Sequence, residues 1–140
     1  MNGVIHTCSH PSDDVHFRLP EDVIFRNIVS YVDFLFNMIA PKKVLFLSVD
    51  GVAPRSKMNQ QRSRRYKSAK EAMDKEAKAR ANNEELPTTP RFDSNCITPG
   101  TEFMSKLHSY MLDEFAKRVQ NNPAWKNVEI IYSGFDVPGE

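Results

Sequence analysis

A carboxylate followed closely by clustered cations is the most informative chemical feature of this 140-residue sequence. Asp50 ends an apolar run, and Lys57, Gln61, Arg64 and Arg65 follow it within a short distance. Carboxylate oxygens suit hard divalent cations, and guanidinium groups bind phosphate oxygens in a bidentate manner. The combination indicates a site that could hold a metal ion and a phosphate together.

The elements around Asp50 are predicted to place it at the edge of a sheet. Residues 43–49 are short, nearly continuously apolar and rich in strand-forming types, which predicts a strand buried on both faces of a parallel sheet. Ligands of open α/β sheets collect beyond the carboxyl ends of the strands, where Asp50 would lie. Gly51 and Pro54 then turn the chain, and a long helix is predicted over residues 58–83.

The basic residues share one face of this predicted helix, because Gln61, Arg64 and Arg65 lie four, seven and eight positions after Lys57. Backbone N–H groups and the helix dipole would add to their attraction for an anion. Residues 55–80 hold ten Lys or Arg against three Asp or Glu, whereas the rest of the chain holds nine against fifteen. A solvated charged face explains residues 70–83 better, so the anion site is predicted in the first two turns only.

The remaining pattern predicts an α/β fold with a mostly parallel sheet. After an amino-terminal loop we expect a helix over residues 21–39, and after the basic helix a Pro-Thr linker over residues 86–90. Thr98 and Pro99 suit the N-cap and the first position of a further helix, and residues 128–132 read as a second strand. The apolar stripe of that further helix comprises Phe103, Leu107, Met111, Phe115 and Val119.

Composition excludes several protein classes. Residues 21–39 are the most apolar segment, but Asp22, Arg26 and Asp33 interrupt it, so it is predicted to be a core helix and not a membrane span. Cys8 and Cys96 lie far apart without a C-x-x-C pair, which gives neither a zinc knuckle nor a disulfide framework. No membrane partner is predicted.

Residues 50–65 also resemble the signature of the 5′→3′ exoribonuclease (Xrn) family. Residues 1–6, 92–101 and 137–140 are similar to three further blocks of the family, in the same order. The resemblance implies a Rossmann-like, PIN-like nuclease core. It also implies that residues 1–140 form a partial amino-terminal exonuclease domain, without its first strand and its carboxyl-terminal remainder, both of which supply further acidic ligands in the family.

The resemblance assigns roles to particular residues. Asp50 and Glu140 match two members of a catalytic carboxylate cluster that holds two Mg²⁺ or Mn²⁺ ions. The 5′-monophosphate pocket of the family falls on Lys57, Gln61, Arg64 and Arg65.

Other titratable residues have weaker assignments. His6 resembles a family residue that stacks on a base near the 5′ end, and a hydrogen-bonded core histidine is the alternative. Asp93 and Asp136 are interpreted as loop residues that form Asx turns, in preference to metal ligands. His10, His16 and His108 show no metal-ligand spacing.

The leading functional hypothesis is a parent protein that hydrolyses 5′-monophosphorylated RNA processively to nucleoside 5′-monophosphates during RNA decay, with the fragment alone inactive. The alternatives are a non-catalytic RNA-binding module and a structure-selective 5′ nuclease acting on DNA. Residues 8–18 and 100–104 look more similar to the cytoplasmic branch of the family than to the nuclear one, which favours a cytoplasmic location. The expected partners are RNA and the missing regions of the parent chain.

Overall fold

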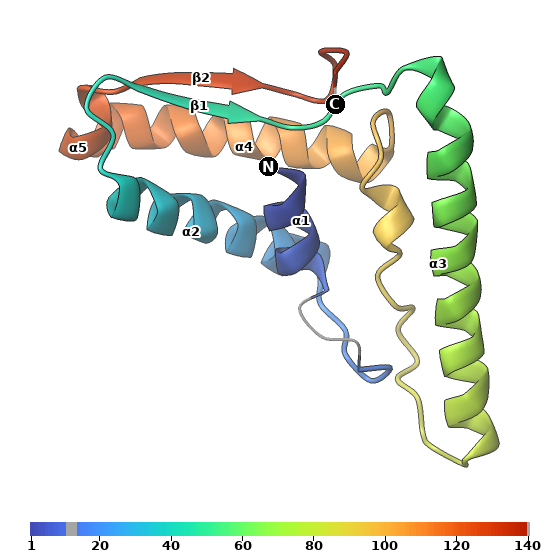
Figure 1. Ribbon diagram of the computed structural model, residues 1–140. Helices are drawn as coiled ribbons and strands as arrows, with labels where there is room; N and C mark the ends of the chain where they lie inside the picture. The colour runs from blue at the N-terminus through green and yellow to red at the C-terminus, as the bar shows by residue number, and fades with distance from the viewer. Residues whose placement is uncertain (11–13, 140) are drawn as a thin grey trace.

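The computed structural model describes residues 1–10 and 14–139, which form a mixed α/β structure that is mostly helical. The order of elements is α1 (Asn2–Ser9), α2 (Glu21–Ile39), β1 (Val44–Ser48), α3 (Arg55–Ala81), the 3₁₀ turn η1 (Ser94–Cys96), α4 (Glu102–Asn121), α5 (Pro123–Lys126) and β2 (Glu129–Ser133). In Figure 1 the two strands lie over α4 and α2, and α3 stands apart as a long upright helix.

The two strands pair in parallel, in a register that runs from Val44 opposite Glu129 to Ser48 opposite Ser133. The predicted parallel arrangement is therefore confirmed. The prediction that the first strand is buried on both faces is wrong, because Phe46 is 61% exposed while Leu47 is 8% exposed. The helices cover one face of the sheet, and no described element covers the other (Figure 1).

The core lies between α2, α4 and the covered face of the sheet. The predicted stripe of α4 is confirmed for Phe103, Leu107, Met111 and Phe115, which are all buried. Burying one side chain of this size contributes about 1.5–3 kcal/mol. At the far end of the sheet, Trp125 stacks on Phe36 with ring centroids 4.2 Å apart. This aromatic contact joins α5 to α2.

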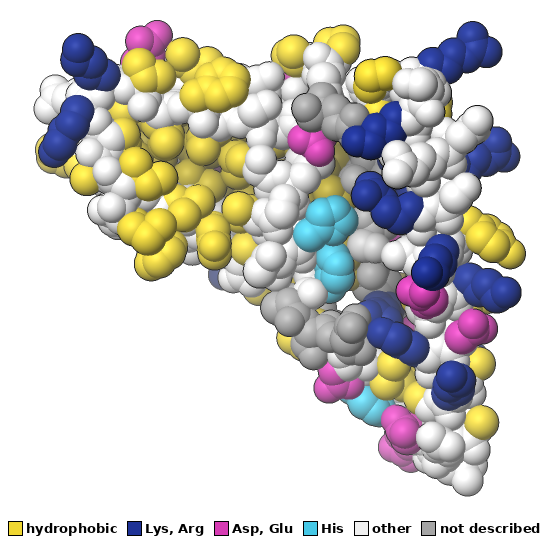
Figure 2. All heavy atoms as spheres, in the orientation of Figure 1, with side chains coloured by type: hydrophobic (Ala, Val, Ile, Leu, Met, Phe, Trp, Pro, Cys, Tyr) yellow, Lys and Arg dark blue, Asp and Glu magenta, His cyan; other side chains and the backbone are white. Residues whose placement is uncertain are grey.

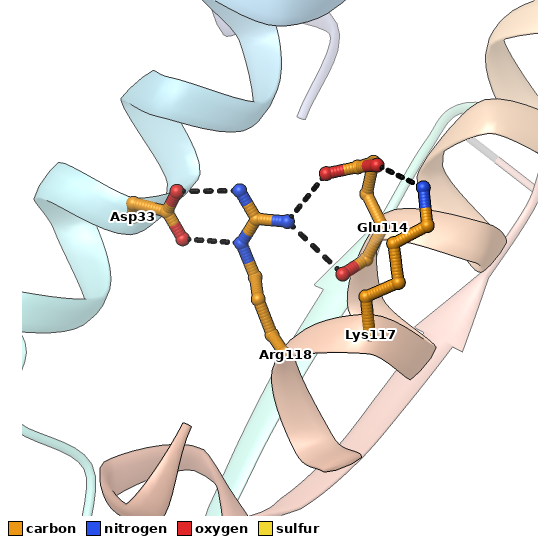
Figure 3. Close-up of polar contacts among 4 residues, drawn as sticks. All are labelled: Asp33, Glu114, Lys117 and Arg118. Atoms are coloured by element: carbon orange, nitrogen blue, oxygen red, sulfur yellow. Dashed lines mark hydrogen bonds and ion pairs between the residues drawn. The ribbon is translucent and has the colours of Figure 1, made fainter. Parts of the chain in front are cut away.

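A polar network joins α2 to α4 beside this core (Figure 3). The Arg118 guanidinium donates to both carboxylate oxygens of Asp33, at 2.6 and 2.7 Å. Its Nη1 also donates to a Glu114 carboxylate oxygen at 2.8 Å, and Lys117 donates to the other oxygen at 2.7 Å. The bidentate geometry fixes the two helices in direction as well as in distance.

The amino-terminal segment was predicted as a loop, and this prediction is wrong, because residues Asn2–Ser9 form α1. Its sequence contains Gly3, Thr7 and other weak helix formers, so local propensity gave no signal. Ile5 and Cys8 are buried where α1 packs against α2. Tertiary packing therefore stabilises this helix.

Three helix boundaries differ from the prediction. The basic helix α3 begins at Arg55 instead of residue 58, directly after Pro54, which lies in the extended conformation that precedes a helix, and it ends at Ala81 instead of residue 83. The N-cap of α4 is Thr101 and not Thr98, since the Thr101 side chain accepts a hydrogen bond from the Met104 backbone N–H. Residues before Thr101 instead form η1 and a turn at Gly100, whose φ of +88° suits glycine.

Helix α3 is poorly buried in comparison with α2 and α4. Ala79 is its only buried residue within the described chain. Both cysteines are free thiols, as predicted. None of the helices in the described ranges has the length and apolar character needed to cross a bilayer.

Candidate nucleic-acid-processing site

The carboxyl end of β1 is held in place by contacts from the first two residues of the chain and from β2. The backbone N–H of Asp50 donates to the side-chain oxygen of Asn2 at 3.1 Å, and the Met1 amino group donates to the Ser48 carbonyl at 2.7 Å. The Val49 N–H donates to the Ser133 carbonyl of β2 at 2.9 Å. Asp50 is therefore fixed at its backbone while its side chain stays exposed.

Gly51 brings the end of the described chain beside Asp50. Its N–H donates to the Gly139 carbonyl at 2.9 Å. A Cβ atom at position 51 would lie 1.8 Å from the Val137 carbonyl oxygen, so any larger residue would displace the backbone of this segment. Glu140, the second predicted carboxylate, lies outside the described residues, but its neighbour Gly139 is in contact with Gly51.

A hollow of about 450 Å³ opens next to Asp50, between α1, α3 and the segment around η1. We call it the Asp50 hollow. Among its lining residues are Asp50, His6, Gln61, Arg64 and Arg65. Figure 2 shows histidine side chains on one side of this region and Lys and Arg side chains along the facing helix α3. The structure thus places the predicted acid, ring and cations around one space.

Lys57 is placed differently. It lies one helical turn before Gln61 and is half-buried, but it does not line the Asp50 hollow. Gln61 and Arg65 are coupled to each other, since Arg65 Nη2 donates to Gln61 Oε1 at 3.4 Å. The cationic group that lines the hollow is therefore formed by Arg64 and Arg65, with Lys57 adjacent.

His6 lies opposite these cations. Its side chain is exposed and meets the His10 ring edge-on at 5.5 Å, a position unlike that of a core histidine. Partial burial lowers the pKa of His6 below its ordinary value, and His10 and then Arg64 lower it further. The lowered pKa favours the uncharged ring, whose face suits stacking on a base.

The structure also settles some of the weaker assignments. The Asp93 side chain accepts a hydrogen bond from the Asn95 N–H at 2.9 Å, which confirms the predicted Asx turn. The Asx turn expected at Asp136 stays a prediction. Sequence reasoning did not assign six polar residues of the hollow to the site: Asn2, His10, Ser68, Ser94, Asn95 and Thr98. All but His10 and Ser68 lie in residues 1–6 or 92–101, whose similarity to the family was the available signal.

A divalent ion fits this site only in part. Asp50 offers an exposed carboxylate that accepts no hydrogen bond from any described residue, which suits a hard cation. Among residues 1–10 and 14–139, however, no group of three or more His, Cys, Asp or Glu side chains could hold a metal. Asp50 thus offers one carboxylate suited to a metal ion, and the described residues do not complete a metal site around it.

Comparison with known families decides the relationship. The family model described as "XRN 5'-3' exonuclease N-terminus" matches residues 1–140. The chain belongs to the XRN 5′-3′ exonuclease family. Human "5'-3' exoribonuclease 1" is 56% identical over 141 residues, which cover 100% of this chain and 8% of that protein.

Other XRN proteins show graded similarity. The Schizosaccharomyces pombe "5'-3' exoribonuclease 1" is 49% identical over 100% of this chain and 10% of that protein. The Gallus gallus "5'-3' exoribonuclease 2" is 44% identical over 100% of this chain and 16% of that protein. The chain therefore spans about a tenth of the length of the exoribonuclease 1 relatives that it matches.

Proposed function

We propose that this chain forms part of a metal-dependent 5′→3′ exoribonuclease that degrades RNA bearing a 5′-monophosphate. The observation that carries the proposal is the Asp50 hollow, which gathers one exposed carboxylate, two guanidinium groups and an aromatic ring around about 450 Å³. The finer family features, namely the PIN-like core and the role as a partial nuclease domain, belong to the same proposal.

In this proposal the cationic wall selects the RNA end. Arg64 and Arg65 bind the terminal phosphate oxygens, Gln61 donates a further hydrogen bond, and Lys57 adds positive charge from the adjacent turn. A terminal phosphate dianion gains more from this cluster than an internal phosphodiester with one negative charge. The protein would therefore engage RNA from its 5′ end.

The remaining residues orient the first nucleotide and the ions. The neutral His6 ring stacks on a base near the 5′ end, an interaction worth about 1–3 kcal/mol without sequence preference. Asp50 and Glu140 would hold Mg²⁺ or Mn²⁺ together with ligands from elsewhere in the protein. Such ions, when bound, lower the pKa of the attacking water and stabilise the leaving oxygen.

The test uses the complete reading frame in which this chain occurs. We expect it to shorten 5′-monophosphorylated RNA faster than 5′-hydroxyl or 5′-triphosphorylated RNA and faster than flap DNA, and Asp50→Asn to abolish turnover. Arg64→Ala is expected to reduce the preference for the 5′-phosphate more than the affinity for long RNA. Asp22→Asn, on the exposed face of α2, is the matched control for charge loss.

Other outcomes separate the alternatives. RNA that binds but never shortens in any divalent metal would indicate a binding module, and preference for flap DNA would indicate a structure-selective 5′ nuclease. The purified 140-residue chain is expected to be inactive, because it supplies too few metal ligands. A cytoplasmic location is part of the proposal, and fluorescence microscopy of the tagged complete protein tests it.

A further inference from the structure

Helix α3, which carries the cationic wall, spans an open space between two supports. Its first end follows the chain turn at Gly51 and Pro54. Its inward face then meets the Asp50 hollow and, further along, a second hollow of about 360 Å³ whose walls include Ser68, Ala72 and Phe92. The middle of α3 therefore faces open space instead of close-packed side chains.

The far end of α3 is anchored by Arg18, which lies in the segment between α1 and α2. Arg18 Nε donates to the Thr89 carbonyl at 2.7 Å, across the chain that returns from α3. Its Nη1 donates to the carbonyls of Val15 and Phe17 at 2.7 and 2.9 Å. Its Nη2 lies 4.0 Å from a carboxylate oxygen of Glu76 on α3.

This anchor is better enclosed than the ion pair between Lys67 and Glu71 within α3, whose side chains are 78% and 60% exposed. The Arg18 side chain is 14% exposed and that of Glu76 is 29% exposed. A second contact nearby, between His16 and Glu84 at 3.2 Å, has both side chains 43% exposed and is expected to contribute little. Because a guanidinium presents several donors in a fixed plane, Arg18 can hold three backbone carbonyls and a carboxylate at once.

We propose that Arg18 is a positioning residue for phosphate recognition: by holding the far end of α3 it fixes the distance of Arg64 and Arg65 from Asp50. The inference rests on the proposed function of the Asp50 hollow. Without Arg18 the far end of α3 keeps weaker supports, such as the packing of Ala79 and the exposed His16–Glu84 contact, and α3 tilts about its first end.

The geometry makes recognition sensitive to this tilt. At about 1.5 Å per residue, Arg64 lies about 14 Å from the start of α3, so a tilt of about 5° moves it by about 1 Å. A misplacement of about 1 Å at a reactive site can reduce the rate by about 100-fold. Arg18 therefore acts at a distance, through the orientation of a helix, without touching RNA.

The test compares Arg18→Ala with wild type in the complete reading frame, using kcat/KM for 5′-monophosphorylated and for 5′-hydroxyl RNA. We expect the ratio of the two values to fall about ten-fold, since only the phosphate contacts are displaced. Arg26→Ala, which removes an exposed pair with Asp22 on α2, is the matched control and should leave the ratio unchanged. Glu76→Ala removes only the partner on α3 and should give a smaller fall.

A double-mutant cycle with Arg64→Ala separates positioning from general damage. If Arg18 acts through the phosphate contacts, Arg18→Ala should cost little further selectivity once Arg64 is absent. Additive losses, or an unchanged ratio in a folded Arg18→Ala protein, would overturn the inference. If Arg18→Ala does not fold, Arg18→Lys and Glu76→Ala provide the same comparison. A wild-type protein without any 5′-phosphate preference would instead contradict the proposed function.

Discussion

The body formed by α2, α4 and the sheet differs from α3 in what stabilises it. The 19-residue helix α2 buries six residues, whereas the 27-residue α3 buries only Ala79. Helix α3 instead contains many strong helix formers and ion pairs one turn apart, such as Lys67 with Glu71 at 3.8 Å. Packing within the body determines the fold. Helix α3 contributes little to that packing and presents a polar face that can bind a ligand.

The largest expected contrast comes from one truncation made in both regions. Met111→Ala, at a side chain with 0% exposure in α4, should lower the free energy of unfolding by about 2–5 kcal/mol because it leaves a cavity. Met73→Ala, at a side chain of α3 that is 72% exposed, should change it by less than about 0.5 kcal/mol. Urea unfolding followed by circular dichroism measures both. Equal effects would contradict the division into a packed body and an unpacked helix.

A second contrast concerns ion pairs within the body and on its surface. Arg118→Ala should cost about 1–3 kcal/mol, because it leaves the carboxylates of Asp33 and Glu114 without their shared partner (Figure 3). Arg26→Ala breaks an exposed pair on α2 and should cost less than about 1 kcal/mol. The side chains of Arg118 and Asp33 are 20% and 35% exposed, which keeps the first figure below that of a fully buried pair. Thermal unfolding of the two variants tests the difference.

A smaller effect is expected from acid. The pKa of His6 is lowered in the folded chain, mainly by partial burial, so the unfolded chain binds a proton at higher pH than the folded one does. The free energy of unfolding should therefore be largest above about pH 6.5 and should decrease as the pH falls below that value. His6→Gln should weaken this dependence. Unfolding curves at several pH values measure it, and an equal slope in the variant would exclude His6 as the source.

The smallest predicted effect reports the distance between the two regions. Burial, His10 and Arg64 all lower the pKa of His6, and Arg64 is the smallest of these three causes. Arg64→Ala should therefore raise the pKa of His6 only part of the way back to its ordinary value. Arg62→Ala, on the same helix but outside the Asp50 hollow, is the control. An NMR titration of the His6 ring measures the change. A rise in the pKa of His6 in Arg18→Ala would show that α3 has moved away from α1.

Much of the fold was predictable because its elements follow local rules. The bounds of α2, the two strands and the apolar stripe of α4 follow from periodicity, and the parallel pairing follows from the order of the elements. Helix α1 was not predictable, because its weak helix formers are held by packing against α2 and by contacts at the end of β1. The start of α4 was misplaced because Thr98 and Thr101 are both plausible caps, and the turn at Gly100 favours the second.

The site was predictable to a similar extent. Helical spacing placed Gln61, Arg64 and Arg65 on one face, and the strand end placed Asp50 near them. Spacing alone could not show that Lys57 lies outside the hollow, or that Asn2 from the amino terminus supports Asp50. Nor could it reveal Arg18, which bonds two neighbouring backbone carbonyls and joins them to the distant Thr89 carbonyl and Glu76 carboxylate.

The contact between Gly51 and Gly139 has a consequence for how sequences of this family can vary in length. The alignment with human exoribonuclease 1 spans 141 residues, whereas those with exoribonuclease 2 relatives span 150 to 153. The contact joins the ends of a long segment, residues 51–139, which includes α3, α4 and β2, and doubling the length of a flexible loop costs only about 0.6 kcal/mol. Insertions near the exposed turn that follows α3, the lowest point of Figure 1, would leave the strand register untouched. We expect evolutionary gaps to concentrate at that turn.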